Sequence, residues 1–215
     1  MSNGTFDFNA FIAESKETLL NPKSYFSSMK TSGGITEPLI KAVIYGTLSG
    51  IIYLIWGFLR IGGVGGGLLG SAVGFMAFVG ALISAVVGLF IGAVILLIIS
   101  SICKGNTDFE ANLRVTAAVM VVMPISALLS FTTGLNVYLG VIISIAVSAY
   151  SLWLLYNGLV EALKCNAGTA KIVCYVIIAI MVLFLLLGLS ARSRATRFIN
   201  EYNKDARELL KDPNK

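Results

Sequence analysis

The side chains best placed to do chemistry in this chain are polar ones that lie inside long uncharged stretches. Ser144, Ser148 and Ser151 recur every three or four residues, and Asn157 extends the same line. Residues at this spacing share one face of a helix, where hydroxyl and amide groups could line a water-filled path beside a kink at Pro124. Hydrogen bonding between neighbouring helices explains the same stripe and is the commoner arrangement. Both interpretations stay open.

Groups suited to enzymatic chemistry are sparse. The chain has no histidine, and its three cysteines lack the CxxC spacing of metal and redox sites. Asp108 and Glu110 stand close together in one charged loop, where we expect them to solvate the loop and to offset the nearby basic residues Lys104 and Arg114. The sequence therefore predicts a protein that is not an enzyme and that holds no metal or cofactor.

Charge is nearly absent from four long stretches, and these indicate the elements that must position the polar groups. Asp, Glu, Lys and Arg are missing from residues 42–59, 61–103, 115–160 and 172–191. A helix needs about 20 apolar residues to cross the hydrocarbon core of a bilayer. Hydrophobic residues make up 57% of the chain and charged ones only 13%, against about a quarter charged in soluble domains. We predict an all-α integral membrane protein.

The two longest stretches decide how many helices cross the membrane. Residues 115–160 contain a turn cluster at 132–136, which divides them into a hairpin of two spans. Glycines crowd the start of 61–103, and each disfavours a helix by about 1 kcal/mol against alanine. We therefore predict a loop or re-entrant piece over 61–73 and one long helix over 74–102. This gives five spans, with six as the alternative if 61–103 folds as two short helices.

The distribution of basic residues favours the other count. With five spans, eight lysines and arginines fall on each side of the membrane, whereas six spans place eleven on one side and five on the other. The positive-inside rule prefers the second distribution. Turn chemistry favours five spans, and five is the count we predict. Lys41, near the start of the first span, is expected to extend its ammonium toward the interface.

Amphipathic helices are expected at both ends of the chain. Apolar residues recur at helical spacing over 8–20, and Asn21-Pro22 ends the pattern. Beyond it, Tyr25 and Phe26 suit either the headgroup layer or packing against the protein's own loops. The tail after the last span has a similar apolar stripe and begins with a basic group that could attract anionic lipid or simply anchor the span. The members of this group are Arg192, Arg194 and Arg197. The predicted division is 1–37, 38–191 and 192–215.

A line of small residues marks the second span as a contact helix. Such faces let helix backbones approach closely in lipid, where no hydrophobic force drives helices together. The face comprises Ala77, Gly80, Ala81, Ser84, Ala85, Gly88 and Gly92. It is expected to serve packing within the bundle or contact between protomers.

Several short motifs together resemble the Yip1 domain family, over roughly residues 19–190. The similar segments are Leu19-Leu20-Asn21-Pro22, Tyr25-Phe26 with Met29, Glu37-Pro38-Leu39, the glycine-rich second region, Lys104 to Phe109, Val121 to Pro124, Tyr156 to Leu159, and Ala167 to Lys171. The resemblance implies five membrane helices and a cytosolic N-terminus. In eukaryotic members it implies a role in vesicle traffic through Rab GTPases and sibling proteins, whereas prokaryotic members share the domain without an established activity.

Two departures from the family pattern affect these expectations. The family's long cytosolic N-terminal region is nearly absent, which argues against GTPase binding, and the charged tail over 192–215 is longer than a typical family ending. We expect a non-enzymatic membrane scaffold or adaptor of the prokaryotic type, in the cell membrane of such a host. Its expected partners are lipids and either a second copy of itself or other membrane proteins, and no nucleic acid is expected. A small transporter or channel with a polar path along the fourth span is the alternative.

Overall fold

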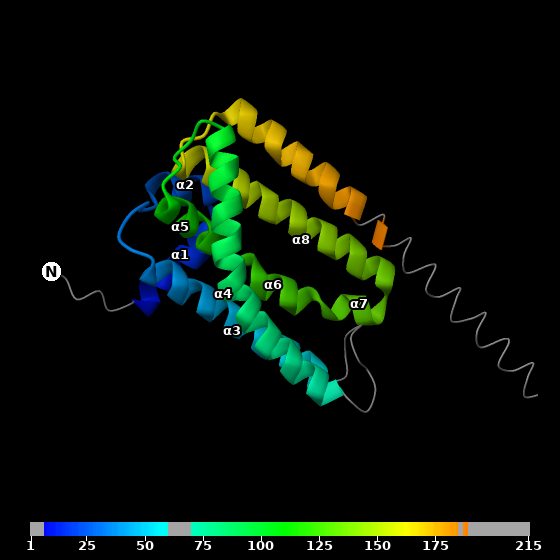
Figure 1. Ribbon diagram of the computed structural model, residues 1–215. Helices are drawn as coiled ribbons and strands as arrows, with labels where there is room; N and C mark the ends of the chain where they lie inside the picture. The colour runs from blue at the N-terminus through cyan, green and yellow to red at the C-terminus, as the bar shows by residue number, and fades with distance from the viewer. Residues whose placement is uncertain (1–6, 60–69, 185–186, 189–215) are drawn as a thin grey trace, which may run out of the picture. The chain divides into compact units, whose positions relative to one another are not determined.

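The computed structural model describes residues 7–59, 70–184 and 187–188, and this part of the chain is helical with no strand (Figure 1). Up to the fifth span, the elements are α1 (Phe8–Leu20), α2 (Pro22–Ser28), α3 (Thr36–Leu59), α4 (Gly70–Ile102), α5 (Phe109–Val119), α6 (Val122–Leu129), α7 (Phe131–Leu135), α8 (Val137–Asn157) and the π-helix η1 (Gly158–Ala162). The all-α prediction is confirmed.

Five helical segments are long and apolar enough to cross a membrane. They are Thr36–Leu59, Gly74–Ile102, Phe109–Leu135, Val137–Ala162 and Ala167–Phe184. The six-span alternative is wrong, because α4 runs unbroken for 33 residues. This helix also begins at Gly70, inside the stretch predicted as loop or re-entrant. In lipid, backbone groups outside a helix lose their hydrogen bonds, which outweighs the low helix propensity of glycine. The rest of that stretch, up to residue 69, lies outside the described residues.

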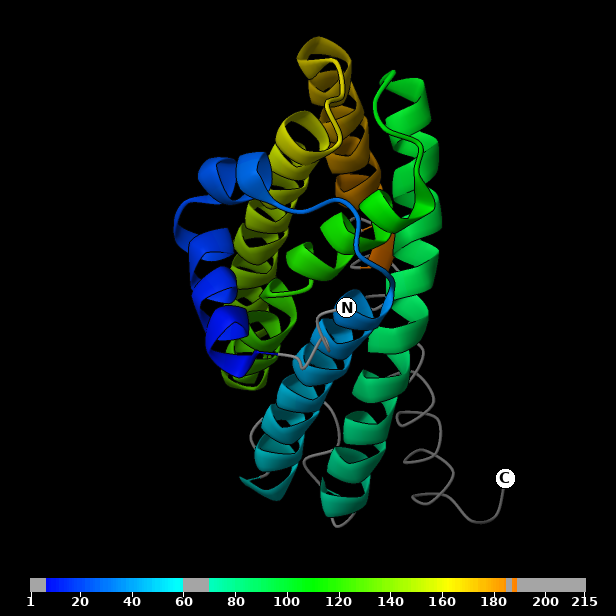
Figure 2. The same cartoon turned by 90° about the vertical axis from the view of Figure 1, so that its left-hand side faces the viewer.

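Within the described part of the chain, the most extensive helix contact joins the first two spans. In both views α3 and α4 lie side by side over much of their length (Figures 1 and 2). A Cβ added at Gly46 would stand 2.6 Å from the Cβ of Ala85, and one at Gly50 would stand 2.7 Å from the ring of Phe78. The two glycines of α3 therefore set the distance between the backbones. Ala42 and Leu89 continue this contact into the fully buried core.

Pro124 breaks the third span into shorter helices. A proline nitrogen cannot donate to the carbonyl four residues earlier, which is that of Met120. The chain accordingly leaves the α-helix after Val119 and makes a tight turn, in which Met123 N donates to Met120 O at 2.9 Å. Helix α6 then starts at Val122. The predicted distortion at this proline is thus an interruption between α5 and α6.

The hairpin between the third and fourth spans lies within the predicted turn cluster. Asn136 begins α8, and its Oδ1 accepts hydrogen bonds from the backbone N–H of Tyr138 at 2.8 Å and of Leu139 at 3.2 Å. These bonds satisfy amides at the start of α8 that have no partner inside the helix. The close approach of α7 to α8 requires Gly140, because a Cβ there would overlap Thr133.

Helices α1 and α2 pack on the bundle before the first span begins. The aromatic side chain of Phe26 is fully buried and that of Tyr25 is 7% exposed, and α2 contacts α8 and η1 (Figure 2). Of the two environments open for these aromatic residues, the structure shows packing within the protein. The chain divides into two compact units, Met1–Ile172 and Val173–Lys215. The charged cluster, the two pockets and the faces of α4 described below lie in the first unit.

Candidate functional site

The serine stripe of α8 partly lines a groove. Ser148 and Ser151 border a hollow of about 460 Å³ between α4, α5, α6 and α8. Most of the other lining residues are aliphatic, and Ser151 Oγ donates to the carbonyl of Val147 in its own helix at 3.1 Å. The groove is therefore mainly apolar, with the hydroxyl groups of Ser148 and Ser151 on its α8 wall and those of Thr116 and Ser126 on α5 and α6.

The other three residues of the predicted polar path do not line this groove. Ser144 is exposed on α8, and Pro124 is half-buried near the start of α6. Asn157 is 7% exposed, and its Nδ2 donates to the carbonyl of Trp153 at 2.7 Å. The structure thus brings together two of the five residues.

The small-residue face of α4 divides into an inner and an outer line. Ala81 and Ala85 are buried toward α3, and Ala77 is half-buried. Gly92 faces α5, since a Cβ there would stand 2.8 Å from Thr116 Cγ2. The outer line consists of Gly80, Ser84 and Gly88, all exposed. Among the described residues no atom lies within 4 Å of a Cβ built at Gly80 or Gly88.

A charged cluster joins α1, α3 and α5 where the first and third spans begin. Lys41 on α3 is 8% exposed, and its Nζ lies 2.6 Å from Glu14 Oε2 on α1 and 2.8 Å from Glu37 Oε1 one turn earlier. The ammonium is therefore held by two carboxylates at the start of the first span, the end at which it was expected to lie.

Arg114 on α5 extends this chain of ion pairs. Its Nη1 lies 2.9 Å from Glu37 Oε2, and its Nε lies 3.1 Å from Glu110 Oε1. Its Nη2 donates to the carbonyl of Gly34 at 3.0 Å, while the Gly34 N–H donates to Glu110 Oε1 at 2.6 Å. Glycine suits this position because the φ of Gly34 is 94°, in a region that residues with a side chain rarely adopt. Acidic and basic groups thus alternate as Glu14, Lys41, Glu37, Arg114 and Glu110.

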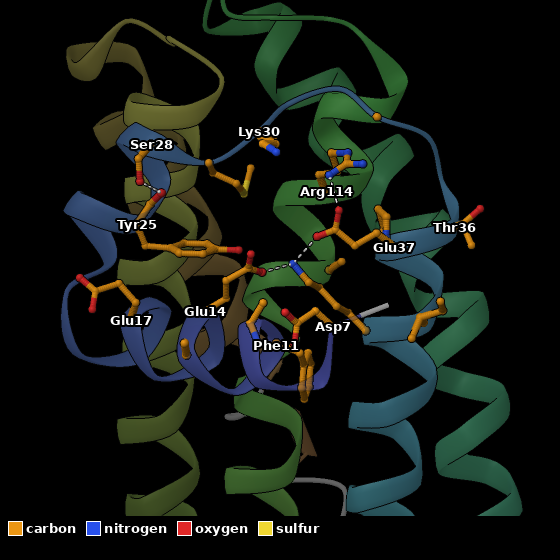
Figure 3. A pocket seen from close by; sticks show the side chains of 18 residues that line it. Asp7, Phe11, Glu14, Glu17, Tyr25, Ser28, Lys30, Thr36, Glu37 and Arg114 are labelled. Atoms are coloured by element: carbon orange, nitrogen blue, oxygen red, sulfur yellow. Dashed lines mark hydrogen bonds and ion pairs between the residues drawn. The ribbon is translucent and has the colours of Figure 1, made fainter. Parts of the chain in front are cut away.

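Beside this cluster lies a polar pocket of about 1040 Å³, here called the charged pocket (Figure 3). Its charged lining residues are Asp7, Glu14, Glu17, Lys30, Glu37, Lys41 and Arg114. Tyr25 forms part of its wall. Burial raises the pKa of the Tyr25 phenol, although the charge of Lys41 acts in the opposite direction.

The sequence contained a signal for this cluster in the spacing of its charged residues, which the overall composition does not show. Glu37 and Lys41 stand four residues apart on one helix, as do Glu110 and Arg114 on another, and such pairs meet on a helix surface. The expectation that Glu110 offsets Arg114 is consistent with the observed pair. The ion pair between Glu37 and Arg114 joins the first and third spans, so sequence spacing could not predict it.

A second junction, made mainly of backbone, ties together the loops on the same side. Gly105 packs against Ser100, Leu163 and Cys165 so closely that a Cβ would overlap all three. Asn106 N donates to Leu163 O at 2.7 Å, and the amide of Asn112 donates to Asn106 O at 3.0 Å. Burial raises the pKa of the Cys165 thiol. This junction is structural support for the ends of α4 and α5.

A comparison with known protein families gives one match. The model of the Yip1 domain matches residues 16–189, which is most of the chain and includes all five candidate spans. The chain belongs to the Yip1 family. No curated protein and no solved structure matches it.

Membership in the Yip1 family and the five apolar helices together establish a multi-pass membrane protein that contacts lipid. The matched range begins within α1 at residue 16, so it leaves out Glu14 but includes the other four members of the charged cluster, Lys41, Glu37, Arg114 and Glu110. The three arginines predicted to contact headgroups, Arg192, Arg194 and Arg197, lie outside the described residues, as does the predicted tail helix.

Proposed function

We propose that this Yip1-family protein is a non-enzymatic membrane scaffold that associates through α4. The single observation that carries the proposal is the outer line of Gly80, Ser84 and Gly88. In the part of the chain that the structure describes, nothing fills the space above the two glycines. The hydroxyl of Ser84 donates to Ala81 O at 3.1 Å, so the line demands no polar partner.

The inner line of α4 supports this reading, because it shows how the chain uses small residues. Gly46 of α3 admits Ala85 of α4 at a separation that a larger side chain would prevent. The outer line repeats small residues at the same four-residue spacing on the neighbouring face. Small residues at this interval are the pattern that allows two transmembrane helices to cross closely.

A second copy of the chain is the partner we propose. Copies inserted with the same topology present α4 in parallel, and a two-fold axis along the membrane normal then brings the two outer lines together. Large exposed side chains flank the line, with Ile83 59% and Val87 48% exposed. They would pack around the crossing point.

The test is the association state of full-length protein reconstituted in lipid, measured by energy transfer between donor-labelled and acceptor-labelled copies. Gly80→Leu and Gly88→Leu should each lower the transfer, because the added side chains separate the helices. Val79→Leu is the matched control, since Val79 is exposed on α4 outside the outer line and its flanking residues, and the change adds volume without filling a glycine position.

Three outcomes separate the possible occupants of the outer line. Loss of transfer in the two glycine variants alone supports a second copy. Unchanged transfer with a lowered unfolding midpoint assigns the line to another segment of the same chain. Unchanged transfer and stability leave the line facing lipid and overturn the proposal.

A small transporter or channel is the alternative, and the groove bordered by Ser148 and Ser151 is the observation that favours it. Its mainly aliphatic lining suits an acyl chain better than a hydrated solute. Flux of ions or small polar solutes from liposomes would test it. A transporter requires flux that Ser148→Val and Ser151→Val reduce, and flux equal to that of empty liposomes rejects it.

The remaining parts of the proposal concern location and the tail. We propose that the protein acts in the cell membrane of a prokaryotic host. We also propose that it divides into three parts, residues 1–37, 38–191 and 192–215.

The arginines Arg192, Arg194 and Arg197 would contact anionic headgroups, each contributing about 1 kcal/mol to membrane binding. Weaker binding of an Arg-to-Gln triple variant to anionic vesicles is the expected result, and equal binding contradicts it.

A further inference from the structure

The charged pocket lies at the depth of the lipid headgroups. Glu37 and Lys41 belong to the first two turns of the first span, and Arg114 belongs to the second turn of the third. Odd-numbered spans begin on the same side of the membrane, so these turns lie at one interface. Helix α1 and the segment after α2 complete the wall (Figure 3). A ligand at this depth meets water and headgroups together.

The charges that line the pocket are nearly balanced. Four acidic side chains and three basic ones contribute to the wall. A site for a simple anion would carry an excess of basic groups, and a site for a simple cation an excess of acidic ones. Balanced charge of both signs suits a dipolar ligand, which carries an anionic and a cationic group.

Two of these side chains are available for such a ligand. Glu17 on α1 is half-buried and Lys30 is exposed, and neither forms a hydrogen bond or ion pair with any other described residue. They line the same pocket without contacting each other. Figure 3 draws Glu17 at the α1 end of the pocket, with its carboxylate directed away from the ion-pair chain, and Lys30 above that chain, toward Arg114.

Lys41 and Arg114 also have N–H groups that are not used in the ion pairs and hydrogen bonds described above. Two of the three N–H groups of Lys41 are accounted for by Glu14 and Glu37. Arg114 uses three of its five N–H groups within the described part of the chain. A phosphate near Lys30 could therefore accept further hydrogen bonds from a fixed guanidinium, as phosphates commonly do.

The geometry points to a binding site for a phosphate-and-ammonium dipole of the phosphoethanolamine type. The phosphate lies toward Lys30 and Arg114, and the ammonium lies toward Glu17 and Glu14, beside the ring of Tyr25, which can add a cation–π contact. The pocket volume of about 1040 Å³ is ample for a group of this size. This inference is independent of the association through α4.

The experiment measures binding to the full-length protein in detergent by the shift of its thermal unfolding midpoint. Three probes are titrated: dihexanoyl phosphatidylethanolamine, free phosphoethanolamine, and dihexanoyl phosphatidylglycerol, which has the phosphate without the ammonium. We expect the ethanolamine lipid to bind about tenfold more tightly than the glycerol lipid, because Glu17 and Glu14 then gain a partner. If free phosphoethanolamine binds as tightly as the lipid, the site takes the soluble dipole.

Substitutions at the two available groups test the assignment of each wall. Glu17→Gln should lower affinity for the ethanolamine lipid about tenfold and leave the glycerol lipid unchanged, whereas Lys30→Gln should weaken both. Lys16→Gln is the matched control, because Lys16 is exposed on α1 beside Glu17 and does not line the pocket. None of these changes touches the buried ion pairs, so the variants should fold.

Three results overturn the inference. The first is equal binding of the ethanolamine and glycerol lipids by the unmodified protein, which would make the pocket a plain anion site. The second is that none of the probes binds. The inference also fails if Glu17→Gln and Lys30→Gln bind the probes as tightly as the control Lys16→Gln does, because Glu17 and Lys30 would then be solvated surface charges.

Discussion

At its start, α3 meets the rest of the molecule through Glu37 and Lys41, whereas one turn or two later it meets α4 through Gly46 and Gly50. The first contact is made by long charged side chains that reach α1 and α5. The second contact is possible because Gly46 and Gly50 have no side chains, so that Ala85 and Phe78 of α4 pack directly against the α3 backbone. A single helix thus uses opposite means of contact within about four turns.

The difference follows from the solvent at each depth. Near the headgroups, water and polar groups lower the cost of holding a charge, and an ion pair can select which helices meet. In the hydrocarbon layer, burying apolar surface gains nothing over lipid, so close fit of backbones decides the contact. Polar pairing therefore determines which elements meet α3 at its start, and shape determines its distance from α4.

Removing Arg114 should have the largest effect on this balance. Arg114→Met leaves Glu37 and Glu110 without their common partner, and breaking a buried ion pair from one side costs about 3–5 kcal/mol. Both carboxylates are partly exposed, at 40% and 27% of their side chains, so we expect the lower end, about 3 kcal/mol. Denaturant unfolding in detergent micelles measures the free energy.

The controls for this prediction separate charge from geometry. Arg114→Lys keeps the charge but cannot reach both carboxylates and Gly34 O together, so it should lose about half as much stability. Lys104→Met, at an exposed loop position, should change little. A stable Arg114→Met variant would show that the cluster contributes nothing to the fold and would remove one side of the comparison.

Filling the notch at Gly46 should have the next largest effect. Gly46→Ala places a Cβ 2.6 Å from that of Ala85, and overpacking of this kind costs about 1–3 kcal/mol. Combining it with Ala85→Gly exchanges the two methyl groups and should restore most of the loss. Gly88→Ala is the matched control, since it meets no described atom and should be neutral or slightly stabilising. Failure of the exchange to restore stability would contradict the shape argument.

The same contrast explains what the sequence could and could not predict. Span number, the helix over residues 8–20 and the division of 115–160 into two spans depend on local pattern and were predicted correctly. The chain turns only at Asn136, and the rest of the predicted turn cluster lies in helix α7. The inner and outer lines of α4 are adjacent on one helix, and no periodicity distinguishes which of Ala85 and Gly88 meets a neighbour. That choice depends on where α3 lies.

The charged cluster was missed for a related reason. Counting uncharged stretches treats every charge as a boundary of the membrane, so Lys41 and Arg114 marked ends of spans and nothing more. In the structure both are buried because acidic partners from other elements neutralise them.

A smaller effect is expected where α1 joins the cluster. Glu14→Gln removes the ion pair with Lys41, and Glu14 is 42% exposed, so we expect a loss of about 1 kcal/mol or less. The readout is hydrogen exchange of α1 amides, which should quicken while α3 amides stay protected. Lys16→Gln, exposed on the same helix, is the control. Unchanged exchange would mean that Phe11 and the Ser15–Tyr45 hydrogen bond hold α1 without the charge.

The smallest effect concerns pH and tests whether the charged pocket is as enclosed as the contacts suggest. Burial raises the pKa of Tyr25 above its ordinary value of 10.0, so the folded protein keeps this proton at a pH where the unfolded chain has lost it. The associated stability is complete below about pH 10 and declines as the pH rises toward the folded pKa. Tyr25→Phe should therefore flatten the decline in unfolding free energy between about pH 9 and pH 11, and Tyr138→Phe, at an exposed position, is the control. A decline equally steep in Tyr25→Phe would show that water reaches this phenol and that the α1 side of the cluster is open.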